Sequence, residues 1–187
     1  MNIINNLKNF IGGMPVNNEI FDNDTLRAAV NLLFDNREEA IRQYGDISTW
    51  NVSQVTDMNN LFRDRVNFND DISNWNVGNV TNMESMFFGA SAFNQPLEQW
   101  NVGNVTNMEG MFFDASAFNQ PLEQWNVGNV TNMGFMFYNA SAFNQPLANW
   151  EREDSTIENV TNMKDMFNGA SAFNQPLEQW NVGNVTN

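Results

Sequence analysis

The side chains that most enzymes use for catalysis are scarce in this sequence. It contains no Cys and no His, which excludes a thiol nucleophile, a histidine-based triad and a Cys/His zinc site. Carboxylates remain, and they cluster at Asp70–Asp71 and at Glu151, Glu153, Asp154 and Glu158. Such clusters can bind calcium or form an acid–base pair, but neither has the spacing of a calcium loop. We therefore expect solvated charge there, with no metal, no cofactor and no enzymatic activity.

The charge balance limits the classes of partner that the protein is expected to bind. The 187 residues include 8 Lys and Arg against 22 Asp and Glu, which gives a net charge of −14. Such a surface repels phosphate backbones and anionic lipids, so we expect no nucleic-acid partner. No apolar run approaches the 18 residues of a membrane span, and the first residues lack the apolar stretch of a secretory signal. The sequence therefore predicts no membrane insertion and slightly favours an intracellular location over surface display.

Side chains suited to catalysis are scarce because most of the chain consists of copies of one repeated unit. Trp recurs at positions 50, 75, 100, 125, 150 and 180, so the period is 25 residues with a single interval of 30. Residues 93–108 and 118–133 both read FNQPLEQWNVGNVTNM. Repeats of this length are typical of stacked arrays in which each unit covers the next.

Within one repeat, the residue pattern predicts a strand followed by a helix. Trp100 and Val102 flank Asn101 in the alternation of a short strand. Thr106 is placed to cap a helix, with Glu109 completing a capping box, and the apolar residues from Met108 to Ala115 follow helical spacing. We therefore predict an α/β repeat solenoid, leucine-rich-repeat-like, with one short parallel strand and one short helix in each repeat.

Three segments are expected along the chain. Residues 1–17 are predicted to be a flexible tail, and residues 18–45 a helical N-terminal cap with a second helical turn from Arg37 to Tyr44 that stops at Gly45. Residues 46–187 hold five full repeats and a truncated sixth. The cap is needed because the first repeat of an array has no neighbour to cover its core.

Two columns of Asn arise from the repeat. Asn76, Asn101 and Asn126 are expected to point outward from the strand face, where they could contact a partner. A second column, which includes Asn94 and Asn119, is interpreted as a structural ladder of side-chain amides that bind loop backbone groups.

An outward aromatic cluster is the other candidate contact surface. Phe88, Phe113 and Tyr138 each follow a core Phe, and Phe135 occupies the position of Gly110 in the preceding repeat. A contiguous exposed aromatic patch usually marks a contact, whereas the alternative is partial burial between neighbouring helices.

The 30-residue interval contains the inserted, charged segment 151–155. Having no apolar residue to bury, it is expected to loop out beside the strands without breaking the stack. There Arg152 and Glu153 could give a partner one distinctive feature to bind, and a bulge without any role is the alternative.

The repeat W-N-V-x-x-V-T-x-M-x-x-M-F-x-x-A-x-x-F-N-Q-P-L resembles that of the BspA-like leucine-rich-repeat surface-protein family. The resemblance covers residues 46–187 and implies a leucine-rich-repeat-like solenoid, surface display and protein binding, without catalytic residues. We accordingly expect a non-catalytic protein-interaction or adhesion-type module with a protein partner of unknown identity. The alternative is a purely structural solenoid or truncated repeat product. An end-to-end homodimer through the last repeat is also considered.

Overall fold

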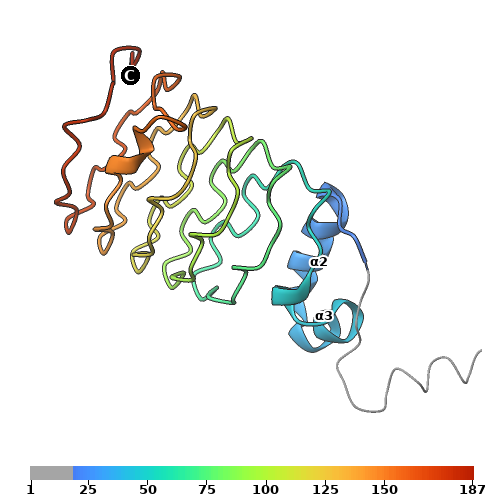
Figure 1. Ribbon diagram of the computed structural model, residues 1–187. Helices are drawn as coiled ribbons and strands as arrows, with labels where there is room; N and C mark the ends of the chain where they lie inside the picture. Colours follow the sequence, from blue (N-terminus) through green and yellow to red (C-terminus); the bar gives the residue numbers. More distant parts are fainter. Residues whose placement is uncertain (1–18) are drawn as a thin grey trace, which may run out of the picture.

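The computed structural model describes residues 19–187, so the tail predicted at 1–17 lies outside the described residues. The described chain starts with two α-helices, α2 (Asn23–Asp35) and α3 (Arg37–Tyr44). Irregular coils follow, one for each repeat, and they lie side by side in chain order from the two helices to the far end of the molecule (Figure 1). Two single-turn 3-10 helices, η1 (Ile47–Thr49) and η2 (Ala148–Trp150), are the only other helical elements in this part of the chain.

Helices α2 and α3 form for local reasons. The Asp22 side chain accepts hydrogen bonds from the backbone N–H groups of Asp24 and Thr25, and it thereby caps the start of α2. Helix α2 buries Leu26, Ala29, Val30 and Leu33 along one face. The predicted second helix from Arg37 to Tyr44 is confirmed, and Gly45 follows it at a φ of 75°.

Helix α2 takes the place that an earlier coil would occupy. In the array, the N–H of Thr81 binds the carbonyl of Thr56 in the preceding coil. Thr56 itself has α2 as its neighbour, and its N–H binds the side-chain oxygen of Asn23 at 2.9 Å. Arg27 likewise donates to the carbonyl of Asn59, 2.6 Å from its Nη1. Side chains of α2 thus satisfy backbone groups that would otherwise face open solvent at the end of the stack.

The predicted strand in each repeat is absent, which makes the α/β solenoid prediction wrong. Among residues 19–187 the coils are joined by isolated parallel bridges such as Asn82 to Asn107, and no named strand or sheet is present. At the expected strand, the N–H of Trp100 binds the carbonyl of Leu97 and that of Val105 binds the carbonyl of Val102. These bonds close turns inside one coil, so the backbone cannot form a continuous ladder with its neighbours.

The predicted helix in each repeat is also absent. The N–H groups of Met108 and Gly110 point to the next coil, where they bind the carbonyls of Asn132 and Gly134. The N–H of Met111, in contrast, binds the carbonyl of Met108 in a turn. Gly110 and Asp114 have φ values of 58° and 55°, which no right-handed helix accommodates. The Thr106 hydroxyl accordingly donates to the carbonyl of Thr81 instead of capping a helix.

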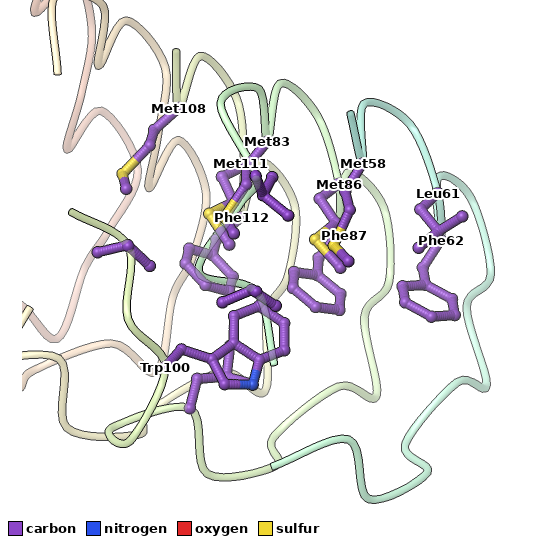
Figure 2. Close-up of a cluster of buried hydrophobic side chains, with 14 of the residues drawn as sticks. Met58, Leu61, Phe62, Met83, Met86, Phe87, Trp100, Met108, Met111 and Phe112 are labelled. Atoms are coloured by element: carbon purple, nitrogen blue, oxygen red, sulfur yellow. The ribbon is translucent and has the colours of Figure 1, made fainter. Parts of the chain in front are cut away.

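The core predicted from the repeat is nevertheless the core of the structure. Met108, Met111, Phe112 and Ala115 are completely buried. Equivalent rings stack from coil to coil, and Phe87 lies 5.6 Å from Phe62 and 5.5 Å from Phe112 (Figure 2). The apolar pattern therefore predicts burial correctly even though it predicts the wrong backbone.

Candidate interaction face

An aromatic column, formed by Phe88, Phe113 and Tyr138, runs along the outside of three consecutive coils. Each of these residues donates its N–H to the carbonyl three residues earlier, which fixes the tight turn that carries the ring. The rings are half-buried and nearly parallel, with centroids 4.3 Å apart for the first pair and 4.5 Å for the second. The structure therefore shows the second alternative from the sequence, partial burial, with the rings lying between coils in place of helices.

Cationic side chains lie at two edges of this aromatic surface. The guanidinium carbon of Arg63, one coil before Phe88, lies 3.9 Å from the centroid of the Phe88 ring and extends the column. The ammonium nitrogen of Lys164, one coil after Phe135, lies 5.6 Å from the centroid of the Phe135 ring. Both distances are within the range in which a cation is attracted to an aromatic face.

Phe135 stands beside the column in an unusual backbone conformation. Its φ is 57°, in a repeat position otherwise occupied by Asn60, Ser85, Gly110 and Asp165. The position requires a positive φ, which small and polar residues adopt more readily than Phe; a bulky residue there costs on the order of 1–3 kcal/mol. Its ring lies 6.4 Å from that of Phe113 and 6.1 Å from that of Tyr138. Phe135 therefore widens the aromatic surface at a local cost in backbone strain.

A pocket of about 150 Å³ opens between the column and Phe135. Its lining consists of Ser85, Phe88, Glu109, Gly110, Phe113 and Phe135. The pocket exists because Gly110 has no side chain: a Cβ at this position would lie 3.3 Å from the Ser85 hydroxyl and 3.8 Å from atoms of Phe88 and Phe113. One carboxylate oxygen of Glu109 accepts a hydrogen bond of 2.7 Å from the side-chain amide of Asn132, which fixes the acid in the wall.

The two Asn columns have different surroundings. Asn76, Asn101 and Asn126 each accept a hydrogen bond from the N–H two residues later, so their side-chain oxygens are used within their own turns. The structural ladder is confirmed: the side-chain oxygen of Asn94 accepts the N–H of Asn119 at 2.9 Å, and the same bond recurs from coil to coil.

The inserted segment lies against the preceding coil, so the expectation that it loops out is wrong, but the stack continues past it as expected: the N–H of Thr161 binds the carbonyl of Thr131. Arg152 donates to the carbonyl of Asn149 at 2.6 Å and reaches the carbonyls of Gln124 and Trp125 at 3.3 Å. Ser155 is 2% exposed and its hydroxyl accepts the N–H of Val127 at 3.1 Å. Glu153 is exposed, and these residues do not line the aromatic pocket.

The carboxylate clusters hold local contacts. Asp70 pairs with Arg37, and a hydrogen bond from Ser73 lowers the pKa of Asp71. Asp154 pairs with Arg152 at 2.6 Å. Within residues 19–187 no group of three acidic side chains is arranged to hold a metal ion. Neither helix in that range has the length and apolar character needed to span a bilayer.

Sequence reasoning missed three parts of the pocket. Glu109 was interpreted as part of a helix capping box, whereas it forms the pocket wall. Ser85 and Gly110 occupy the same repeat position as Phe135, so they line a single column of the stack. The sequence did contain a signal: Gly110 stands at the repeat position that Phe135 occupies in the next repeat. A residue without a side chain leaves space beside a large one.

Comparison with known proteins identifies the family. A family model described as "Mycoplasma protein of unknown function, DUF285" matches residues 28–150 and 151–187. No curated protein and no solved structure matches the chain. Because the matched segments cover most of its length, the chain belongs to the DUF285 family of Mycoplasma proteins of unknown function.

Proposed function

We propose that this protein is a non-catalytic protein-binding module and that the aromatic column with Phe135 is its contact surface. The observation that carries the proposal is the continuous outer stack of Arg63, Phe88, Phe113 and Tyr138 beside an open pocket. Contiguous aromatic surface on the outside of a protein usually marks an interaction site. Aromatic side chains and Arg are also the residues that contribute most to binding energy in protein interfaces.

The rigidity of the column favours binding. Each ring is held between its neighbours, and each of its backbone segments is tied to the next coil, as in the bond from the N–H of Gly110 to the carbonyl of Gly134. A surface that is already ordered loses little conformational entropy when a partner covers it. The resemblance of the repeat to BspA-like surface proteins supports the same class of function, and the match to DUF285 is consistent with that resemblance.

A purely structural role is the second candidate. The rings of Phe88 and Phe113 are half-buried against each other, so the column contributes to cohesion between coils whether or not a partner binds. In that case substitutions in the column would lower stability without affecting any interaction.

The two candidates differ in a capture experiment with extracts of the cell that produces the protein. The tagged chain is compared with the variants Phe113→Ala and Asn101→Ala, after thermal melting has shown that each variant is folded. Protein binding at the aromatic column predicts a partner that is retained by Asn101→Ala and lost by Phe113→Ala. Loss on Asn101→Ala alone would move the contact surface to the Asn column, and capture unaffected by either substitution would exclude both surfaces.

A further inference from the structure

The pocket beside Gly110 combines aromatic walls with a negative charge. Phe135 supplies an aromatic wall and Glu109 supplies the carboxylate. Phe88 and Phe113 present their edges, because their ring faces are covered by Arg63, by each other and by Tyr138. Oε2 of Glu109 accepts the amide of Asn132, whereas Oε1 accepts no hydrogen bond from residues 19–187. A site of this kind attracts a cation, since the face of Phe135 and the carboxylate both carry negative potential.

Two cations of the chain already lie over rings of this aromatic surface. The guanidinium group of Arg63 lies over Phe88, at the end of the column before the pocket. Lys164 approaches Phe135 from the following coil, whereas Ser85, Glu109 and Gly110 belong to the preceding coils. The pocket itself therefore lies between two occupied positions, and no Lys or Arg of residues 19–187 lines it.

Size and charge select the occupant. A cavity of about 150 Å³ accommodates a benzene molecule in another protein, so the four heavy atoms of a guanidinium group fit into this pocket. A guanidinium group stacks flat on aromatic rings and donates two parallel hydrogen bonds to a carboxylate, which a lysine ammonium cannot do. The net charge of −14 adds a general attraction for a basic partner.

We propose that this pocket binds the guanidinium group of an arginine side chain on a basic partner protein, stacked against Phe135 and paired with Glu109. This inference rests on the proposed protein-binding function and specifies the chemistry by which the partner is recognised. Phe135 closes one side of the pocket, which gives a functional reason for a bulky residue at a positive φ.

The test uses the full chain labelled with nitrogen-15 and titrated with the peptide acetyl-Gly-Arg-Gly-amide, followed by NMR at the backbone amides. We expect saturable shifts centred on Gly110 and Phe135, with a dissociation constant on the order of millimolar for so small a ligand. The same peptide with citrulline, which is uncharged and nearly identical in shape, should give no saturable shift there. Equal responses to the two peptides would overturn the proposal, as would shifts located elsewhere on the chain.

Two matched substitutions separate pocket binding from general charge attraction. Glu84 is the equivalent of Glu109 one coil earlier and accepts the same kind of bond, 3.0 Å from the amide of Asn107, but it does not line the pocket. Glu109→Gln should weaken binding of the Arg peptide by roughly tenfold, as loss of a close charge pair does, and Glu84→Gln should leave it unchanged. Equal weakening by both would refute a specific site.

A third variant fills the pocket. Gly110→Ser introduces the residue that the preceding coil carries at the same position and the same backbone conformation, so the fold should be retained. It should abolish the peptide shifts. The result also separates this inference from the proposed function: partner capture that survives Gly110→Ser but not Phe113→Ala would refute arginine recognition and leave protein binding at the column in place. If the peptide binds but Phe113→Ala has no effect on partner capture, protein binding at the column is refuted and arginine recognition by the pocket is left in place.

Discussion

The indole Nε1 of Trp125 donates a hydrogen bond to the backbone carbonyl of Leu97, 2.9 Å away in the preceding coil. The same bond joins Trp100 to Ile72 at 3.2 Å and Trp150 to Leu122 at 2.9 Å. The Trp rings are buried, so each indole N–H needs a partner inside the protein. Each Trp therefore ties its coil to the previous one by a hydrogen bond as well as by packing.

We predict that Trp125→Ala destabilises the protein by about 3–5 kcal/mol, because it leaves a large cavity in the core. Trp125→Phe retains a ring but removes the indole donor, while the carbonyl of Leu97 keeps the N–H of Trp100, so the cost should be smaller, about 0.5–1.5 kcal/mol. Urea denaturation of the two variants and of Gln124→Ala, an exposed neighbour, measures these differences. Equal stability of Trp125→Phe and the wild type would show that the indole bond contributes nothing.

The Asn ladder gives a second prediction. The side-chain oxygen of Asn119 accepts the N–H of Asn144 at 3.0 Å and the side-chain amide of Gln145 at 3.0 Å. Asn119→Ala removes this acceptor oxygen and both of its hydrogen bonds and should cost about 1–3 kcal/mol, whereas Asn119→Asp keeps an acceptor oxygen and should cost less. Thermal melting of the two variants tests this order, and the reverse order would contradict a ladder held by side-chain oxygens.

The periodicity and the core of the fold were predictable from the sequence, but the predicted backbone conformation was wrong. Met111 and Phe112 are buried as their spacing predicts. However, spacings of three and four residues suit successive turns as well as an α-helix, and the apolar pattern does not distinguish them. The distinguishing residues were Gly110 and Asp114, whose types tolerate the positive φ that they adopt.

The candidate site was predictable in part. The aromatic residues were recognisable because Phe88, Phe113 and Tyr138 recur at one repeat position outside the core pattern. The pocket was not, because its formation depends on how Phe135 of one coil faces Gly110 of the previous coil. That relationship follows from the stacking of the coils, and a strand-and-helix interpretation of the repeat places these residues differently.

The first two repeats give a prediction for pH. The pKa of Asp46 is lowered mainly by a hydrogen bond from the Ser48 side chain and, to a smaller extent, by one from the Ser48 N–H. The side chain and N–H of Ser73 lower the pKa of Asp71 in the same way. A folded-state pKa below the unfolded value of about 3.9 means that folding favours the ionised acid. The resulting stability is present above that unfolded value and is lost as the pH falls through the lower, folded-state pKa.

We therefore expect the double variant Asp46→Asn and Asp71→Asn to lose less stability than the wild type when the pH is lowered from 5 to 3. Because other carboxylates titrate in both proteins, the relevant quantity is the difference between the two melting curves at each pH. Parallel curves over this range would show that the two turns do not couple folding to protonation.

The inserted segment provides the last prediction, in which a point substitution is more harmful than a deletion. Removing residues 151–155 joins Trp150 directly to Thr156 and restores the 25-residue spacing of the other repeats. We expect this deletion to keep the fold with a change of about 1 kcal/mol or less, since it returns the coil to the form that its neighbours adopt. Ser155→Ala instead keeps the insertion but removes the buried hydroxyl that accepts the N–H of Val127 at 3.1 Å, and it should cost about 1–3 kcal/mol. Glu153→Ala, at an exposed position of the same segment, serves as the control and should be neutral. Denaturant unfolding of the three variants gives the order directly. If the deletion unfolds the protein while Ser155→Ala is tolerated, the segment is an essential part of its coil, and the alignment that places the insertion at 151–155 is wrong.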